Sequence, residues 1–269
     1  MYDLAFDKPF KLKYLKTIYA NESNESYFYE AFDDVEKRKV GVKVVTVQQK
    51  DLEAAKVEAS VIHKFAGLTT QIPALYGTHY DARMGKFYLI MQLIEQGKTL
   101  REVQQSGGMI DVIDLLLKLC DILIPIHQSK YQHRDLKPEN IMIKGRSVYL
   151  IDFNLSAAIP FKGEGTRKYQ APEQHRDMKG IGLDRVDLFA LGIIGYELIQ
   201  GKAPNFGIDY SAFPGEAGWE FFNPPSNEAM VPPKLIDVIM RCLSYAPKAR
   251  YGDARELKQA IMQVRRGGH

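Results

Sequence analysis

The chain has 269 residues, enough for one large domain or two lobes, and its composition is that of an ordinary globular protein. Its 36 basic and 33 acidic residues leave a net charge of +3, which gives no support for a nucleic-acid partner or a membrane surface. The N-terminus lacks the basic start and apolar run of a signal peptide, and the longest apolar run, 188–196, is too short to span a bilayer. Cys120 and Cys242 lie in apolar helical patterns and are predicted to be buried free thiols, so we expect a cytoplasmic protein, leaving open its delivery into another cell.

The N-terminal part of the chain is predicted to form a small sheet with one main helix. Alternating or aromatic residues predict strands, which are expected over 10–15, 27–32, 40–45, 72–80 and 87–94. Apolar residues at three- and four-residue spacing predict a helix over 50–66, between the third strand and the fourth.

The C-terminal part, after Thr99, is predicted to be mainly helical, with a long helix over 112–128 and hairpins around residues 133–152. A Gly-containing break near 92–98 separates the two parts. We therefore expect one domain over 1–269. Its segments are an N-terminal lobe over about 1–93, a hinge over about 92–98, a C-terminal lobe over about 99–264 and a flexible tail over 265–269.

One short stretch gathers an acid, a cation and an amide, which are Asp135, Lys137 and Asn140. The segment 141–151 reads as strand, turn, strand, and a hairpin there would bring Asn140 beside Asp152. Asp135 could accept a proton from a hydroxyl, and Lys137 could neutralise an anion in transfer. Two oxygen ligands next to them suit Mg²⁺, which binds through few protein groups plus phosphate oxygens. Taken singly, each of these residues could equally belong to a solvated loop.

Taken in order, these elements resemble the eukaryotic-type protein kinase superfamily over essentially the whole chain. The motifs that carry the resemblance are HRDLKPEN at 133–140, DFN at 152–154, GTRKYQAPE at 165–173, DLFALG at 187–192 and Arg250. The resemblance implies an α+β, two-lobed protein-kinase fold, with a small antiparallel-sheet N-terminal lobe and a larger, mainly helical C-terminal lobe. It also implies that Asp187 anchors the catalytic loop and that Arg250 pairs with Glu173. Lys137 two residues after Asp135, with Thr166 expected beside both, is similar to the Ser/Thr branch.

The same resemblance implies an ATP- and Mg²⁺-dependent enzyme that transfers the γ-phosphate of ATP to Ser/Thr hydroxyls of a protein substrate. The implied catalytic residues are Asp135 as base, Lys137 and Asn140 beside it, and Lys43 held by Glu58 against the phosphates. The implied metal ligands are Asn140 and Asp152. Met91 is similar to the gatekeeper, and the backbone of Gln92 and Ile94 would bind the adenine. The residues implied to surround the nucleotide are Ile18, Asn21, Ser23, Ser26, Phe28, Gly41, Lys43, Met91, Gln92, Ile94, Met142 and Asp152.

Three features depart from the family pattern. The glycines of the phosphate loop are replaced by Asn21, Ser23 and Ser26, whose side chains hinder the approach of backbone N–H groups to phosphates. Asn154 replaces the glycine after the metal-binding aspartate, and asparagine is the residue that best tolerates left-handed backbone after glycine. Phe28 and Gly41 stand where the family usually has valine and alanine, so a larger residue faces a smaller one.

A regulatory expectation follows from Arg134, which precedes Asp135 and in the family often binds a phosphate on the activation segment. That segment, 154–165, has Ser156 as its only hydroxyl. Glu164 carries a permanent negative charge that could reach Arg134, or it could simply be solvated. We therefore predict that this segment needs no phosphorylation.

Three functions stay open at this point. The motifs favour an active protein serine/threonine kinase. The glycine-free loop and Asn154 are also compatible with a pseudokinase that acts as a scaffold or binding module, and small-molecule and lipid kinases share the fold. Labelled ATP and Mg²⁺, offered to the chain alone and with a generic protein mixture, distinguish them. No feature of the sequence identifies the substrate, the pathway or the oligomeric state.

Overall fold

The computed structural model describes residues 10–22, 25–48, 52–157, 164–175, 183–204 and 231–267. The chain divides into two compact units, Met1–Gly97 and Lys98–His269. The boundary falls inside the segment 92–98 that the sequence predicts as a hinge. Each unit is described in turn.

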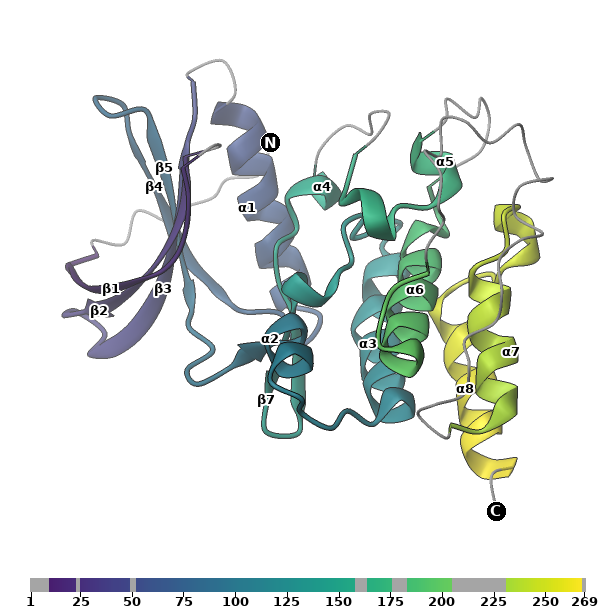
Figure 1. Cartoon of the computed structure of the whole chain (residues 1–269). Helices are drawn as coiled ribbons and strands as arrows, with labels where there is room; N and C mark the ends of the chain where they lie inside the picture. Colours follow the sequence, from purple (N-terminus) through teal and green to yellow (C-terminus); the bar gives the residue numbers. More distant parts are fainter. Residues whose placement is uncertain are drawn as a thin grey trace. The chain divides into compact units, whose positions relative to one another are not determined.

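The first unit contains a five-stranded antiparallel sheet in the order β1-β2-β3-β5-β4, with α1 following β3 along the chain (Figure 1). The bounds are β1 Leu12–Asn21, β2 Ser26–Asp33, β3 Arg38–Thr46, α1 Leu52–Ala66, β4 Leu75–Asp81 and β5 Lys86–Gln92. Every predicted strand and the predicted helix are confirmed, although β1 extends beyond the predicted segment 10–15 to Asn21. This extension escaped prediction because β1 is an edge strand whose residues from Lys13 to Ala20 are exposed, so no burial pattern marks them.

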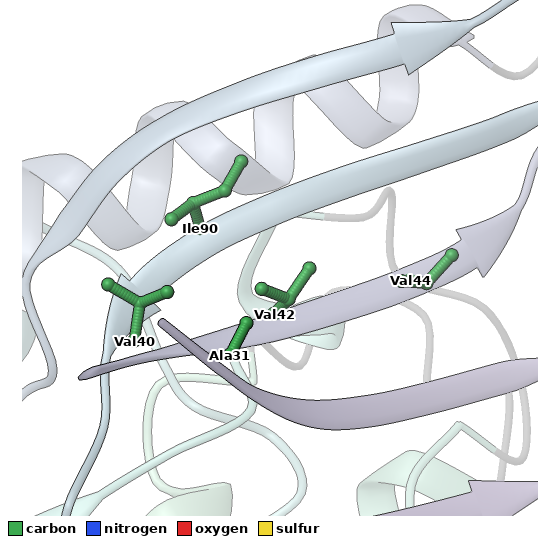
Figure 2. Packing of buried hydrophobic residues seen from close by; sticks show 5 residues of the cluster. All are labelled: Ala31, Val40, Val42, Val44 and Ile90. Carbon is green, nitrogen blue, oxygen red and sulfur yellow. The ribbon is translucent and has the colours of Figure 1, made fainter. Parts of the chain in front are cut away.

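Strand β3 sorts its side chains onto two faces, because successive residues of a strand point in opposite directions. Val40, Val42 and Val44 are buried on one face together with Ala31 of β2 and Ile90 of β5 (Figure 2). Gly41 and Lys43 lie on the opposite face. The β2–β3 register sets Phe28 directly across from Lys43, so Phe28 shares that second face.

The second unit is mainly helical. Its longer helices are α3 Val112–Gln128, α6 Val186–Gln200, α7 Pro233–Cys242 and α8 Ala254–Gly267, preceded by the short α2 Leu100–Gln105. Helix α3 packs against α6 and α8, and α7 packs against α6 and α8 (Figure 1). Helix α6 is buried on nearly every side, because its sequence is apolar around most of its circumference.

Short strands, one-turn helices and turns complete this unit, most of them between residues 138 and 175. A three-stranded sheet, in the order β6-β7-β8, contains β6 Lys98–Thr99, β7 Ile141–Lys144 and β8 Ser147–Leu150. The unit also contains two one-turn helices, α4 Asn154–Ala157 and α5 Pro172–His175. Its 3-10 turns are η2 Pro138–Asn140, η3 Arg167–Tyr169 and η6 Pro247–Ala249.

Helix α3 begins and ends where the sequence predicts. Asp111 caps it, since its side-chain oxygen Oδ1 accepts a hydrogen bond from the Asp114 N–H at 3.0 Å. Helix α8 includes residues 265–267 of the segment expected to form a flexible tail over 265–269, whose flexibility stays a prediction. Its buried face, which includes Leu257, Ile261 and Val264, holds this helix against the unit almost to its end.

Both cysteines are buried and free, as predicted. None of the helices in the described part of the chain has the length and apolar character that a membrane span requires.

Candidate active site

The backbone of the stretch at 133–140 is fixed by Asp187, in the first turn of α6. The Asp187 carboxylate is fully buried and accepts hydrogen bonds from the backbone N–H groups of His133, at 2.8 Å, and Arg134, at 2.9 Å. His127 Nε2 lies 2.9 Å from the same carboxylate. Burial alone would raise the pKa of Asp187, but the hydrogen bond from His127 and the charges nearby hold that pKa below its ordinary value. The predicted anchoring role of Asp187 is confirmed.

The carboxylate of Asp135 is held by donors on both oxygens. Oδ1 accepts from the backbone N–H of Thr166 at 2.7 Å, and Oδ2 accepts from Lys137 Nζ at 2.8 Å. Lys137 Nζ also donates to Thr166 Oγ1 at 2.8 Å. Thr166 therefore lies beside both residues, as predicted. A carboxylate oxygen, an ammonium group and a hydroxyl group are thereby held within hydrogen-bonding distance of one another.

The predicted hairpin between Asn140 and Asp152 is confirmed. Strands β7 and β8 pair Ile141 with Leu150, and the Ile151 N–H donates to the Asn140 backbone carbonyl at 3.0 Å. Asn140 and Asp152 therefore leave the hairpin at the same end. The Asn140 side-chain nitrogen donates to the backbone carbonyl of Asp135 at 2.9 Å, so the amide oxygen is the atom of this side chain that could bind a metal ion.

These two residues suit Mg²⁺ by their chemistry. Both offer hard oxygen atoms, and Mg²⁺ commonly binds through one or two such protein groups together with phosphate oxygens. Among the residues that the structure describes, no group of three or more His, Cys, Asp or Glu side chains could hold a metal ion. Mg²⁺ bound to two protein oxygen atoms commonly completes its coordination with water and phosphate oxygens.

Asn154 does not adopt the left-handed backbone that its position suggested. It is the first residue of α4, whereas the positive φ, +66°, falls on Asp152. Phe153, between the two, is buried, and its ring centroid lies 4.8 Å from that of His133. The substitution of glycine by Asn154 is therefore absorbed without a strained residue at 154.

In the first unit, Lys43 of β3 forms an ion pair with Glu58 of α1. Lys43 Nζ lies 3.0 Å from Glu58 Oε1, and the two side chains are only 15% and 14% exposed. The predicted pairing is confirmed. It presents a partly desolvated ammonium, held in one orientation, on the face that Gly41 and Phe28 share.

Phe28 packs directly over Gly41. A Cβ atom added to Gly41 would lie 2.4 Å from Phe28 Cζ. Non-bonded carbon atoms do not approach so closely, so the ring or the backbone would have to shift. The larger residue does face the smaller one, as the sequence indicates. The aromatic ring thus fills the space that an alanine methyl group would need.

The segment predicted to bind the adenine begins in β5, where Met91 is half-buried and opposite Gly41 in the register. The Gln92 N–H donates to the Ala74 carbonyl at 2.8 Å. The Ile94 carbonyl accepts from the Gly97 N–H at 3.1 Å. Adenine binding by the Gln92 carbonyl and the Ile94 N–H stays a prediction. Met142 is half-buried in β7, in the second unit.

The predicted phosphate loop is the hairpin between β1 and β2. Asn21 and Ser26 are paired across it, and Ile18 is exposed on β1. Without glycine, left-handed backbone falls on Glu25, whose φ is +48°. Ser23 lies outside the described residues. Phosphate binding by this hairpin stays a prediction.

Glu164 reaches Arg134, as the sequence allows, but the pair is buried rather than solvated. Arg134 Nη1 lies 3.2 Å from each carboxylate oxygen of Glu164. The two side chains are 5% and 0% exposed. The predicted pair between Arg250 and Glu173 is likewise confirmed. Arg250 Nη1 lies 2.6 Å from Glu173 Oε1 and Nη2 lies 2.9 Å from Oε2, and neither side chain is exposed.

A charged cluster next to the site was not predicted. Arg101 of α2 donates to Glu139 at 2.8 Å and to Glu197 of α6 at 2.9 Å, and Glu197 also accepts from the Tyr169 hydroxyl at 2.6 Å and from Lys168 at 2.9 Å. Burial would raise the pKa of Glu197, but the hydrogen bonds that it accepts, above all the one from Arg101, hold that pKa below its ordinary value. The signal in the sequence was a second acid, besides Asp187, within the largely apolar pattern of α6. Its partners are too distant in sequence to be identified from spacing.

Comparison with known proteins finds similarity to protein kinases. The family model described as "Protein kinase domain" matches residues 24–262. The chain is 33% identical over 195 residues to the serine/threonine-protein kinase PknB of Mycolicibacterium smegmatis, covering 67% of this chain and 31% of that protein. It is 29% identical over 255 residues to a probable serine/threonine-protein kinase of Clostridium acetobutylicum, which covers 88% of this chain and 37% of that protein. It is 28% identical over 220 residues to the serine/threonine-protein kinase PknA of Nostoc sp., which covers 76% of this chain and 37% of that protein. The chain therefore spans about a third of the length of these relatives.

Proposed function

Because this chain belongs to the protein kinase domain family, we propose that it transfers the γ-phosphate of ATP to serine and threonine hydroxyls of protein substrates. The observation that carries the proposal is the bonding of Asp135 and Lys137 to each other and to Thr166, at 2.7 to 2.8 Å. It supports a site in which a carboxylate and an ammonium group are fixed beside the turn that would receive a hydroxyl. We further propose that residues 1–269 form one kinase domain.

Asp135 would orient the acceptor hydroxyl and take its proton. Its Oδ1 is bound by a backbone N–H and its Oδ2 by Lys137, so the carboxylate cannot rotate freely. Lys137 would stabilise negative charge on the phosphoryl group in transfer. Such positioning and charge stabilisation supply most of the rate enhancement in phosphoryl transfer, because little covalent chemistry falls to the protein.

Asn140 and Asp152 would hold Mg²⁺, which when bound neutralises charge on the phosphates. Lys43, oriented by Glu58, would bind the α- and β-phosphates. The Gln92 carbonyl and the Ile94 N–H would bind the adenine. The other side chains proposed to line the nucleotide are Ile18, Asn21, Ser23, Ser26, Phe28, Gly41, Met91 and Met142.

A second candidate function is that of a pseudokinase, a scaffold or binding module with weak or no transfer. The observation in its favour is the combination of a glycine-free hairpin between β1 and β2 with an aromatic ring over Gly41. Both features alter the part of the first unit that would receive the nucleotide. A small-molecule or lipid kinase has less support, because Thr166 and the buried Glu173–Arg250 pair belong to the protein-kinase pattern.

The test is transfer from γ-labelled ATP with Mg²⁺, using the chain alone and with casein and histone as acceptors. We expect label on serine or threonine. Asp135→Asn, which keeps the shape of the side chain, should reduce transfer by about 10²- to 10⁴-fold while ATP still binds. Asp121→Asn, in which a surface acid of α3 is changed, serves as the control and should leave transfer intact. ATP binding without transfer by the unchanged chain would favour the scaffold, and native transfer by Asp135→Asn would refute the assigned mechanism.

A further inference from the structure

Helices α3 and α8 pack side by side (Figure 1), and a groove of about 730 Å³, open to solvent, lies along them. Ligand sites in proteins commonly have volumes of about 300 to 1,000 Å³. The groove lies wholly in the second unit, and none of the residues proposed for phosphate transfer or nucleotide binding lines it. The proposed reaction therefore does not account for this groove.

Part of the lining is apolar. Leu117 of α3 is only 7% exposed, and Met262 of α8 is half-buried. Methionine adapts its shape to different partners, because its side chain is unbranched and flexible. The aliphatic stems of the long charged side chains around these two residues add to the apolar surface. An apolar side chain from another molecule can therefore pack against this part of the groove.

The lysines and the acids of the lining are already paired with one another. Lys118 Nζ lies 2.6 Å from Asp114 Oδ2 and also donates to the Arg146 carbonyl at 2.5 Å. Lys258 of α8 pairs with Asp121 of α3, so this pair joins the two helices that form the groove. The two lysines and two aspartates neutralise one another and add no net charge to the lining.

Arg265 and Arg266 differ from the two lysines. Both are exposed in the last turn of α8 and line the groove, and neither forms an ion pair or a hydrogen bond with any residue that the structure describes. Cations in the last turn of a helix are common, because they interact favourably with its dipole, but these two also share a groove with Leu117 and Met262. The lining holds four cations against two acids, a net charge of +2. Since a guanidinium group matches a carboxylate with two parallel hydrogen bonds, this groove suits an acidic ligand.

We propose that the groove is a docking site for an acidic peptide segment of a partner protein. Carboxylates of the segment pair with Arg265 and Arg266, while an apolar side chain packs against Leu117 and Met262. From residue 114 to residue 121 the wall formed by α3 extends about 10 Å, at about 1.5 Å per residue. That length matches about three residues of an extended peptide. The inference goes beyond the proposed kinase reaction, because binding here requires no transfer of phosphate.

The charges of the lining favour a peptide over an anionic bilayer. The side chains of Asp114 and Asp121 are 40% and 48% exposed, so a bilayer laid across the groove would bring its phosphates toward two like charges. A flexible peptide places its acids at the arginines and leaves the two aspartates uncovered. A groove also accommodates one inserted side chain, whereas lipid headgroups form a broad surface.

The first measurement is binding of a fluorescein-labelled peptide, DEELEED, followed by fluorescence anisotropy. It offers six carboxylates around one apolar side chain. The neutral peptide NQQLQQN should bind at least about tenfold more weakly, because it cannot pair with the arginines. The peptide DEEGEED should bind about fivefold more weakly, because it lacks the apolar side chain. Raising NaCl from about 0.05 to about 0.5 M should weaken the binding of DEELEED, since salt screens exposed charges.

The second measurement compares two double variants that remove the same charge. Arg265→Gln with Arg266→Gln should lower the affinity for DEELEED about tenfold, as expected for the loss of two partly exposed ion pairs. Lys234→Gln with Arg255→Gln is the matched control, because both residues are exposed on α7 and α8 and neither lines the groove. It should bind DEELEED like the unchanged chain.

A third variant, Asp114→Asn, should change the affinity in the opposite direction. It releases Lys118 from its ion pair, so DEELEED should bind up to about fivefold more tightly. A gain of affinity cannot arise from misfolding. The ¹³C-labelled methyl group of Met262, assigned through its loss in Met262→Leu, should shift when DEELEED is added.

Four results would overturn the proposal. They are the absence of binding at about 1 mM DEELEED, in the affinity range of the weakest specific complexes, an equal loss of affinity in the two double variants, weaker binding by Asp114→Asn, and an unchanged Met262 methyl signal at saturation. Sedimentation of the chain with phosphatidylserine vesicles, combined with failure to bind DEELEED, would assign the surface to anionic lipid instead. Loss of phosphate transfer in the unchanged chain would refute the proposed function but leave this test intact.

Discussion

Replacing Gly41 by alanine should produce a steric conflict confined to one aromatic ring. The new Cβ would lie 2.4 Å from Phe28 Cζ and 3.1 and 3.2 Å from Phe28 Cε2 and Cε1. Non-bonded carbon atoms prefer about 3.5 to 4.0 Å, so the ring must move by roughly 1 Å or more. The backbone at 41 cannot easily yield, because Gly41 lies in β3 between Glu30 of β2 and Met91 of β5.

The expected cost is that of overpacking, about 1–3 kcal/mol in the free energy of unfolding. Phe28 is half-buried, which favours the lower part of that range, because its ring can turn partly toward solvent. In a background with Phe28→Val, the methyl group meets a smaller side chain. There Gly41→Ala should be neutral or stabilising, since glycine inside a strand is itself unfavourable by about 0.5–1 kcal/mol relative to alanine.

The assay is a double-mutant cycle by urea unfolding, with the unchanged chain, Gly41→Ala, Phe28→Val and the double variant. A coupling energy of about 1–3 kcal/mol between positions 28 and 41 is expected, within the range found for residues in contact. Equal effects of Gly41→Ala in both backgrounds would refute the reasoning. Titration of the same four proteins with ATP reports whether the contact also shapes nucleotide binding.

Three further predictions concern regulation, phosphate binding and pH. Phosphatase treatment followed by removal of the phosphatase should leave the initial rate unchanged, because Ser156 is buried and Thr166 Oγ1 is bonded to Lys137; a lag that ends with phosphate on Ser156 or Thr166 would contradict this. Replacing Asn21, Ser23 and Ser26 by glycine should strengthen ATP binding, measured by titration, since backbone N–H groups then approach phosphate more closely; equal or weaker binding would count against it. Burial raises the pKa of Cys242 to about 12 and raises that of Cys120 too, so above pH 9 unfolded thiols ionise while native thiols stay protonated. Stability to urea should therefore fall from pH 9 toward 12, less steeply in a variant with both cysteines replaced by alanine.

Local signals predicted most of the elements and the geometry of the catalytic loop. Helix α3 begins and ends as predicted, because its cap at Asp111 and its apolar spacing are both local. The Asn140–Asp152 hairpin followed from two apolar runs around Gly145. The resemblance to kinases supplied the pairs Lys43–Glu58 and Arg250–Glu173 and the anchoring of the catalytic loop by Asp187.

Other features depend on contacts that no local pattern encodes. The sequence allowed Glu164 to reach Arg134, but it did not predict the burial of the pair or the hydrogen bonds that Gln170 and Gln174 donate to the backbone carbonyls of these two residues. The cluster of Arg101 with Glu197 joins residues on separate helices, and nothing in the spacing of either marks the other.

The departures from the family pattern are distributed unevenly, and this bears on which function the chain performs. The donors on Asp135, the orientation of Asn140 and the anchor at Asp187 all come from the second unit and match the pattern. Of the three departures, the one in that unit, Asn154, is absorbed at the start of α4. The other two, the glycine-free hairpin and the ring of Phe28 over Gly41, belong to the first unit, where Lys43 and Glu58 are nonetheless paired. A chain that had lost transfer altogether would have no physical need for a carboxylate fixed on both oxygens and partly desolvated, so the altered first unit is better explained by a change in how tightly nucleotide binds than by a loss of chemistry.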